Sequence, residues 1–574
     1  FNSIPDFIAG QPSQIFYGNA AITNDPNDTA AQFEYDINTV YIQDEFAVGD
    51  SADVTLGLRY DWYTNSSFPT ANPFFLARNG FSNTENLDGK GILQPRFGFN
   101  WDVTDRFSLR GGAGLFAGGN PNVWVSNSYS NDGIRAVQVQ LGTTPPPPNI
   151  LTNPNSQSER AGGQAINPNN ALWGVPTSMF NTVAGSAPNS AVAAIDPDFQ
   201  PASEWKFSVG GTYDADLGNL PLGLGGEYRL DADYIFAVTN NAATIVNAGL
   251  IRVGTAPDGS PLYKRADKSD PDCLNPATAP TAACATRTAD DLLLTNAGNG
   301  GEQHVYSVAL SKSYDFGLDW AVAYAHVDAK DTRSMTSSVA GSNFGSIAVS
   351  DINNPDQARS NFLIPNRFTL NVNYELELFK DFTTRFSLFG EHYQSRPYSY
   401  VTAFGGTVDT WGDNNEGLHL LYVPTGPTDP NVVFCSNTNA ADNTLCGGAA
   451  TNFDTTSFFA WADAVGLARG AQTGRNDFEG GWNNKFDLKV EQEFPLPFGE
   501  ASAFLVVENI GNLLNDEWGV IYESPFPQRT SVVEIDRDVA TNRFIYRRLA
   551  LPNIDDPVDS VSFWTVKVGA TYRF

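Results

Sequence analysis

Residues 561–574 of the chain read VSFWTVKVGATYRF. The even-numbered positions from Trp564 to Phe574 are all apolar, and the odd-numbered positions from Thr565 to Arg573 are small or polar. Successive side chains of a strand point to opposite faces, so this segment predicts a strand with one apolar and one polar face. Strands of about 9–11 residues with such alternation cross the outer membrane in β-barrels.

The same alternation recurs many times upstream. Val54, Leu56, Leu58, Tyr60 and Trp62, for example, alternate with Thr55, Gly57, Arg59 and Asp61. Soluble β-sandwiches also alternate, but here the polar face carries charges of both signs and the apolar face is rich in aromatic residues, which suits a wet lumen and surrounding lipid. We therefore expect an all-β fold, a transmembrane antiparallel up-and-down β-barrel. About 13 strands are predicted, at residues 33–47, 52–64, 92–103, 105–117, 203–214, 225–237, 304–314, 318–327, 366–376, 382–393, 484–493, 500–509 and 561–574.

The connections between these segments alternate between short and long. Tight turns are expected near residues 48–53, 103–105, 314–317, 378–381 and 495–499. Long connections are expected at 64–91, 119–202, 239–303, 328–365, 395–483 and 511–560. Tight turns on one rim and long extracellular loops on the other are typical of outer-membrane barrels.

Composition narrows the function classes. No run of eighteen apolar residues is present, so no transmembrane helix is expected. The net charge of −30 argues against nucleic acid as a partner. The acidic surface is interpreted as solubilising, with attraction of cations by acidic loops as the alternative. The chain begins Phe1-Asn2-Ser3 without a secretory signal, which we interpret as a processed or truncated chain.

The four cysteines form two matched local pairs, Cys273 with Cys284 and Cys435 with Cys446. Ten residues separate the members of each pair, and both pairs lie in polar loop sequences. Zinc sites favour closer cysteine spacing, and no histidine lies near either pair. We therefore predict two loop disulfides, formed in an oxidising compartment, that order loops otherwise too polar to pack.

No catalytic, cofactor-binding or metal-binding residues are predicted, and the protein is not expected to be an enzyme. Residues 112–117 fit a dinucleotide-binding pattern but lie inside an alternating strand rather than between a strand and a helix. The cluster of Asp267, Asp270 and Asp272 is interpreted as a solvated turn, with calcium binding as the alternative. The four histidines, which are far apart in sequence, are interpreted as interface or loop residues: His304, His326, His392 and His419.

Two further groups each have two interpretations. Charged residues on the predicted lumen face either dock a plug or simply form a hydrated surface: Arg59, Arg110, Arg229, Asp231, Arg367, Arg385, Glu391, Lys489 and Glu491. Aromatic residues in the long loops either bind a ligand or pack the loops together: Trp124, Trp173, Phe180, Trp411 and Trp461. The ligand-binding residues themselves stay unassigned.

Several short stretches, in order along the chain, support a family resemblance. They are YIQDE at 41–45, GLRYD at 57–61, QPRFGF at 94–99, IPNRFTL at 364–370, TGRN at 473–476, ENIGNL at 508–513 and the terminal Phe574. In these stretches the chain resembles the barrel of a TonB-dependent outer-membrane receptor, most closely the Oar-like branch. One departure is Asn366, where the family often has histidine.

The resemblance implies a Gram-negative outer-membrane receptor that imports a scarce nutrient with energy from TonB. It also implies a 22-strand barrel closed by an N-terminal plug. Neither a plug nor a TonB box is recognisable, so residues 33–574 are expected to form the C-terminal part of the barrel and residues 1–32 an extracellular loop segment. Expected partners are outer-membrane lipid, TonB through a preceding region, and an unknown extracellular ligand. The alternatives are a structural or adhesive protein that binds a partner through its loops, and a passive porin.

The strand register also predicts which aromatic residues contact the membrane. Rings with an apolar body and a polar tip suit the headgroup boundary. We expect the following residues on the outer face, many of them near a membrane interface: Trp62, Trp101, Trp205, Tyr234, Tyr374, Trp564 and Phe574. An odd number of strands cannot close antiparallel on itself, so the first and last strands are expected to be unpaired with each other.

Overall fold

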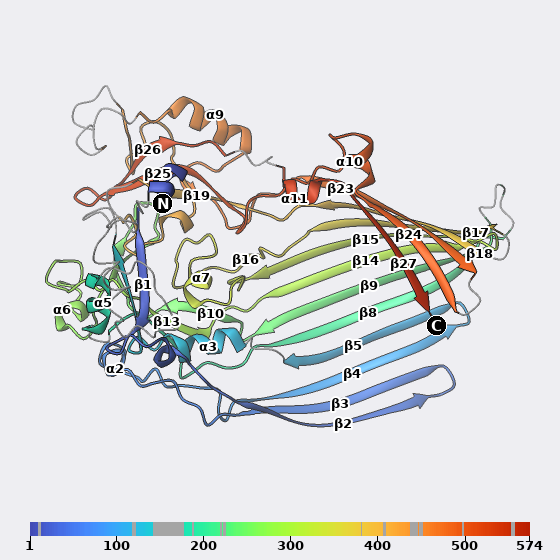
Figure 1. Ribbon diagram of the computed structural model, residues 1–574, viewed down its shortest axis with the longest axis horizontal. Coiled ribbons are helices and arrows are strands. Elements are labelled where there is room, and N and C mark those ends of the chain that lie inside the picture. Colours follow the sequence, from blue (N-terminus) through green and yellow to red (C-terminus); the bar gives the residue numbers. More distant parts are fainter. Residues whose placement is uncertain are drawn as a thin grey trace.

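One long antiparallel sheet dominates the computed structural model (Figure 1). The structure describes residues 1–9, 13–117, 122–141, 177–185, 189–218, 221, 225–379, 382–405, 409–436, 446, 452–495, 499–552 and 557–573. The membrane-interface prediction for Phe574 and the loop-aromatic prediction for Trp173 lie outside these residues.

The main sheet follows the chain order, with each strand paired to the next along the path. Its strands are 9 to 14 residues long. The short strand β16 (Ala358–Arg359) pairs with β15 beside this path. The path consists of β2 (Asp36–Val48), β3 (Ala52–Thr64), β4 (Gly91–Thr104), β5 (Phe107–Ala117), β8 (Ser203–Asp216), β9 (Glu227–Asn240), β14 (Glu302–Ser313), β15 (Leu318–Asp331), β17 (Asn366–Phe379), β18 (Phe382–Gln394), β23 (Trp482–Pro495), β24 (Glu500–Glu508) and β27 (Thr565–Arg573).

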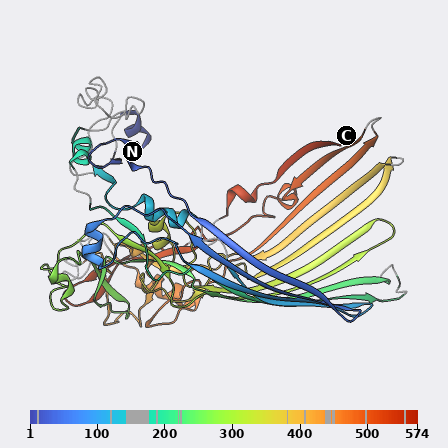
Figure 2. The same cartoon turned by 90° about the horizontal axis from the view of Figure 1, so that it is seen from below.

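Each of the segments predicted from alternation coincides with one strand of this path, within four residues at either end. The sheet is curved, and it runs from β2 round to β27 (Figure 2). Within the described residues β2 and β27 are its two edges, because no hydrogen-bonded pairing joins them. The total of 22 strands stays a prediction.

Cross-strand register separates the two faces of the sheet as the sequence pattern predicts. Leu230 pairs with Tyr213 on one side and with Leu310 on the other, and Leu310 pairs with Val322. On the opposite face, Asp231 lies across from Thr212. Because directly paired residues share a face, one face is apolar from strand to strand and the other is polar.

The two rims of the sheet differ. Short turns join strands at one rim, such as Val48 to Ala52 and Thr104 to Phe107. At the other rim the long connections fold into a layer of small sheets and helices, which we call the cap (left in Figure 1). The N-terminal α1 (Ile4–Ala9), β1 (Ile15–Ala20) and η1 (Pro26–Thr29) lie at the cap end, where β1 pairs with β6 (Ala136–Leu141).

Within the described residues, the cap contains four small sheets besides the β1–β6 pair. Their orders are β10-β13-β7, β11-β12, β19-β25-β26-β21 and β20-β22. The cap strands are β7 (Val192–Ile195), β10 (Ala243–Asn247), β11 (Leu250–Thr255), β12 (Pro261–Arg265), β13 (Asp291–Asn296), β19 (Ser399–Phe404), β20 (Tyr422–Val423), β21 (Val432–Phe434), β22 (Ala471–Gln472), β25 (Arg529–Asp538) and β26 (Arg543–Leu549). The helical segments of the connections are α2 (Pro73–Asn79), α3 (Asn122–Ser130), α5 (Thr177–Ala184), α6 (Pro271–Leu274), α7 (Ala340–Phe344), η3 (Glu416–Leu418), α9 (Thr455–Val465), α10 (Ile510–Leu514) and α11 (Asp559–Ser562).

Local sequence signals set the ends of the cap helices. The Asn72 side chain accepts hydrogen bonds from the backbone N–H groups of Phe74 and Phe75, and Pro73 opens α2. Gly80 ends this helix at φ 78°, a backbone conformation that costs glycine little. These capping signals satisfy the free N–H groups of the first turn, so short helices form within otherwise polar connections.

Two large apolar cores hold the cap together. One core contains Leu262 from the connection between β9 and β14, Trp411 and Phe458 from that between β18 and β23, and Val532 and Phe544 from that between β24 and β27. The other contains Leu87, Phe199 and Ile347, from three further connections. The expectation that these loops are too polar to pack without disulfides was therefore wrong: burial of apolar side chains also orders them.

Both predicted disulfides are present in the cap. Cys273 and Cys284 are bonded with an S–S distance of 2.07 Å, and Cys435 and Cys446 with one of 2.05 Å. All four sulfur-bearing residues are buried, the second pair against Ile545 of β26. Each bond therefore closes a short loop within one connection of the cap. None of the helices in the described part of the chain is both long and apolar enough to cross a membrane.

Candidate ligand-binding site

The polar face of the main sheet carries a network of ion pairs. Arg110 Nη2 donates to Asp233 Oδ1 at 2.7 Å, between β5 and β9. Similar contacts join most of the charged residues predicted for this face to neighbours within the sheet: Arg59 with Asp61, Arg229 with Asp231, Arg385 with Glu375 and Lys489 with Glu491. These contacts favour the interpretation of a hydrated, internally neutralised surface for those residues.

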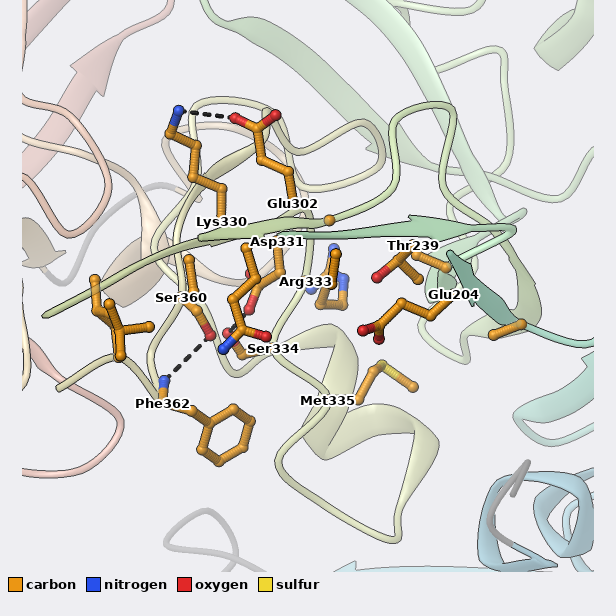
Figure 3. Close-up of a pocket in the computed structure, with 18 of the residues that line it drawn as sticks. Glu204, Thr239, Glu302, Lys330, Asp331, Arg333, Ser334, Met335, Ser360 and Phe362 are labelled. Atoms are coloured by element: carbon orange, nitrogen blue, oxygen red, sulfur yellow. Dashed lines mark hydrogen bonds and ion pairs between the residues drawn. The ribbon is translucent and has the colours of Figure 1, made fainter. Parts of the chain in front are cut away.

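A pocket of about 770 Å³ lies where this polar face meets the cap (Figure 3). The floor of the pocket is formed by residues of β8, β9, β14, β15 and β17 that lie on the same face as Asp231. Many of these floor residues have small side chains, such as Ala237, Ala325 and Ala329. Its roof includes Trp124, Met335 and Phe362 from the cap. The pocket is open because the floor side chains are small and because the folded cap fixes the roof residues at a distance from the sheet.

A buried arginine fixes the wall of the pocket. Arg333 Nη1 donates to the carbonyl oxygens of Asn343 and Phe344, and its Nη2 donates to that of Ile352. Burial, together with the nearby Arg475, lowers the pKa of the Arg333 guanidinium. Because neutral carbonyl groups take up its donors, Arg333 positions α7 and the following loop rather than presenting a free charge.

A second arginine ties the pocket wall to a distant connection. Arg475, from the TGRN stretch, contacts Asp331 Oδ1 through Nη1 at 3.2 Å and also donates to the Asp331 backbone carbonyl. The neighbouring Asn476 donates to the carbonyl of Arg359 and to the side chain of Asn361. The rim end of β15 and the segment before β23 are therefore held in one arrangement.

Arg367 and Glu204 present charge to the pocket itself. Arg367 begins β17 on the polar face, and its Nε is buried without a hydrogen-bond partner among the described residues. Its guanidinium lies over the ring of Tyr393 at 5.3 Å. Glu204 lies at 3.4 Å from Lys206 and lines the same pocket. Glu302 and Lys330 form a pair at 3.0 Å on the apolar face, above the strands in Figure 3.

The loop aromatics pack the cap instead of lining one ligand site. Trp411 is 1% exposed, Trp461 packs against the same core, and Phe180 packs against a smaller core near β1. Trp124 packs on the second core, donates from Nε1 to the carbonyl of Ser337 and also lines the pocket roof. Sequence reasoning missed several pocket residues, because no local motif marks them: Asp331, Arg333, Ser334, Met335, Ser360, Phe362 and Leu363.

The acidic turn at 267–272 uses its carboxylates internally. Asp267 accepts hydrogen bonds from the backbone and side chain of Ser269, and Asp270 accepts from the backbone N–H groups of Asp272 and Ala285. This geometry favours the interpretation of a solvated turn. Among the described residues, no group of three or more histidine, cysteine or acidic side chains is placed to hold a metal ion.

A second acidic cluster lies inside the cap beside Trp411. The His419 ring stacks on Trp411 with centroids 3.8 Å apart, and its Nε2 lies 2.9 Å from Asp413 Oδ2. Burial, together with repulsion from Asp409 and Asp413, raises the pKa of Glu416 to about 7. Burial and the Asp413 charge likewise raise the pKa of Asp409. Deprotonation of this cluster therefore opposes packing of the cap.

The described members of the predicted membrane-interface set share the apolar face, and all but Tyr234, which lies in the middle of β9, lie towards one rim or the other. Trp62 and Trp205 lie near the cap end of their strands, as does Trp564 just before β27, whereas Trp101 and Tyr374 lie near the turn end. Tyr234 pairs with Tyr306 and stacks on its ring at 4.8 Å. Two aromatic levels on one apolar face are the pattern of a membrane-spanning barrel. That these rings contact lipid stays a prediction.

A wide, amphipathic antiparallel sheet with tight turns at one rim and folded loops at the other defines the class of outer-membrane β-barrel proteins. A family model described as an outer membrane beta-barrel domain matches residues 2–516, and the chain belongs to this family. It is accordingly a protein of the outer membrane of Gram-negative bacteria. No curated protein shows significant sequence similarity to the chain.

Several solved outer-membrane transporters are similar in structure. They include the FrpB iron transporter from Neisseria meningitidis (12% identity, TM-score 0.36) and the transporter YddB from Escherichia coli (10%, 0.39). The siderophore receptor PirA from Acinetobacter baumannii is another (12%, 0.37). The alignments cover 83–84% of this chain but 41–42% of the solved chains, so the chain spans less than half of their length.

Proposed function

We propose that the protein is an outer-membrane receptor that captures a scarce nutrient at the cap and imports it with energy from TonB. One observation carries the proposal: the pocket lies between a folded cap and the charged polar face of the sheet. A ligand that enters from the cap side would meet Trp124 and Phe362 first and the charges of Arg367 and Glu204 behind them. The Oar-like branch and the TonB connection rest on the sequence resemblance.

The packed cap favours this function over a passive porin. A porin needs a water-filled opening at the loop rim. Here the long connections pack against one another in two apolar cores at that rim. Osmotic swelling of liposomes that contain the full-length protein measures this difference directly. Swelling in small sugars at porin-like rates would contradict the receptor proposal.

Uptake by the bacterium that encodes the protein provides the main test. The gene is deleted and the strain is grown in competition with its parent under limitation for iron, cobalamin or oligosaccharides. A defect under one limitation, matched by deletion of tonB and restored by the wild-type gene, is the expected result. Loss of surface attachment without any growth defect would favour the adhesive alternative instead.

Pocket variants then locate the ligand. Arg367→Met removes a charge from the pocket, whereas Arg385→Met removes one from the same polar face near the turn rim, where Arg385 pairs with Glu375. Arg367→Met is expected to lower ligand uptake at least about tenfold, as expected for an anchoring charge–ligand contact. Equal uptake by the two variants would place the ligand elsewhere.

We further propose that β2 and β27 pair with additional strands in the membrane. Unpaired backbone groups in lipid cost several kcal/mol each, and these two strands are the free edges of the described sheet. Hydrogen exchange of the membrane-embedded, full-length protein tests this. Slow exchange along residues 36–48 and 565–573 is expected, and exchange as fast as in exposed loops would contradict the pairing.

A further inference from the structure

The charged groups around the pocket beneath the cap are not equally neutralised. Glu204 pairs with Lys206 at 3.4 Å, and Asp331 pairs with Arg475 at 3.2 Å. Arg367 also lines the pocket, but among the described residues its guanidinium forms neither an ion pair nor a hydrogen bond. The pocket therefore contains a cation that no carboxylate of the described chain contacts.

A second cation raises the electrostatic potential of the same pocket. Arg333 is buried in the pocket wall, and neutral carbonyl groups take up the donors of its guanidinium. The ion pair of Glu302 with Lys330 lies on the other side of the strands from Met335 (Figure 3). The pocket is therefore locally positive, although the chain as a whole has a net charge of −30, and it favours an anionic ligand.

Apart from these charges, most of the pocket surface is apolar. The floor includes small side chains such as Ala237 and Ala329, and the roof includes Trp124, Met335 and Phe362. A ligand rich in hydroxyl groups would leave many of them without hydrogen bonds against this surface, which costs binding free energy. The larger part of a ligand that fits here is therefore apolar.

Two serine side chains of the wall use their hydroxyl groups within the protein. Ser334 Oγ donates to Asp331 and accepts from the backbone N–H of Asn361. Ser360 Oγ accepts from the backbone N–H of Phe362, a contact drawn in Figure 3. Arg367 is thus the pocket side chain with charge to offer a ligand and no partner for it among the described residues.

We propose that the pocket binds a monocarboxylic acid with an apolar body, its carboxylate on Arg367 and its body between the alanine floor and the aromatic roof. The proposal rests on the proposed receptor function and names its class of substrate. A carboxylate suits a guanidinium because it accepts two parallel hydrogen bonds from the planar fork. The floor extends over four strand spacings from β8 to β17, or about 19 Å along the sheet, which leaves room for an extended body.

The test titrates 2-naphthylacetate into the full-length protein in detergent micelles, followed by calorimetry, with protein-free micelles as the blank. The neutral 2-naphthylacetamide has nearly the same shape. Wild type should bind the acid at least about tenfold more tightly than the amide, as expected for a hydrogen-bonded charge pair. Arg367→Met should remove this difference and leave the affinity for the amide unchanged, which also shows that the pocket is intact. The control Arg385→Met, near the turn rim, should change neither affinity.

Two further variants keep the proposal testable if Arg367→Met does not insert. Arg367→Lys keeps the charge without the fork and should bind the acid about threefold more weakly than wild type. Phe362→Ala removes apolar contact from the roof and should weaken the acid and the amide by the same factor. The charge and the apolar body are thereby tested separately.

Equal affinity of wild type for the acid and the amide, or no binding of the acid, would overturn the proposal. An Arg367→Met variant that loses acid and amide alike would also overturn it, because Arg367 would then only support the pocket wall. Tighter binding of 2-naphthylmethylphosphonate than of the acid would exclude a carboxylate as the preferred head group.

The receptor proposal fails by a different measurement. Binding of the acid without any uptake that depends on tonB would contradict import and leave the carboxylate site standing. Uptake that depends on tonB, of a nutrient that carries no carboxylate, would contradict this class of ligand and leave the receptor standing.

Discussion

Arg78 and Asp291 form a two-pronged ion pair inside the cap, although they lie 213 positions apart in the chain. Arg78 Nε and Nη2 donate to the two carboxylate oxygens at 2.8 and 2.9 Å, and the side chains are 2% and 1% exposed. The pair joins the end of α2 to the start of β13. Two connections of the rim are thereby fixed against each other.

Removal of one partner of this pair should loosen the cap. Arg78→Met leaves the buried Asp291 carboxylate with the Asn79 amide, which donates at 3.1 Å, and with the more distant cation of Arg287, at 3.4 Å. We expect a loss of about 3 kcal/mol in the stability of the cap, as for other broken buried pairs. Hydrogen exchange of residues 291–296 measures it. The control variant Arg548→Met removes an exposed ion pair with Glu534 and should lower the stability of the cap by less than about 1 kcal/mol. Equal losses of stability in the two variants would show that the buried pair stabilises the cap no more than an exposed one.

The stability of the cap should depend on pH through Glu416. The pKa of the Glu416 carboxyl in the folded protein, about 7, lies above its ordinary value of 4.5. Between these values the folded state binds more protons than the unfolded state, so stability is full below about pH 4.5 and falls as pH rises through 7.

Glu416→Gln should therefore stabilise the cap at pH 8 by on the order of 2 kcal/mol and have little effect at pH 4. Thermal unfolding of the full-length protein at the two pH values is the measurement. Glu479→Gln, at an exposed side chain, serves as control. A variant whose melting temperature shifts equally at both pH values would rule out this titration as the cause.

Loss of the disulfide Cys435–Cys446 should lower the local stability of β21 and β26. In the chain-entropy model such a short cross-link contributes on the order of 3 kcal/mol. We expect the double variant Cys435→Ser/Cys446→Ser to exchange faster at Val432–Phe434, because Cys435 and Cys446 pack on Ile545. The strands of the main sheet, such as β9, should keep their protection. Faster exchange throughout the sheet would mean that the cap and the main sheet unfold together.

Brominated lipid should quench the fluorescence of the predicted membrane-interface tryptophans but not that of the tryptophans in the cap core. Trp101 is 44% exposed on the apolar face, whereas Trp411 is 1% exposed inside the cap. In vesicles of brominated phospholipid, Trp101→Phe should reduce the quenched part of the emission and Trp411→Phe the unquenched part. Emission from Trp101 that stays unquenched would place the apolar face inward and shift the strand register by one residue.

The strands of the main sheet could be predicted because each one carries its own signal. Alternation along residues 52–64 or 366–376 is visible without any knowledge of neighbouring strands. The cap strands could not be predicted in this way. β13 lies between β10 and β7 in its sheet, and its run Leu292-Leu293-Leu294 is buried on both faces, so no alternation of apolar and polar residues marks it. Its parallel partner β7 comes from another connection.

The candidate site was beyond sequence reasoning for the same reason. Arg367 was identified as a charge on the polar face, but its neighbours in the pocket, such as Trp124 and Met335, come from connections far away in the chain. The loop aromatics had two interpretations, and only their burial, as for Trp411, favoured packing. The disulfides were easier to predict from the sequence, because each joins cysteines only 11 positions apart.

The sequence by itself determined the amphipathic strands, their faces, the alternation of turns and loops, and the cysteine pairs, because side-chain direction in a strand and short loop closure are local properties of the chain. Only the tertiary structure decided the cap and the pocket. Arg78 meets Asp291, and Phe486 lies over Gly390, because the curved sheet brings separate strands and connections together. Contacts of that kind depend on burial and on the geometry of distant segments, which no local pattern encodes.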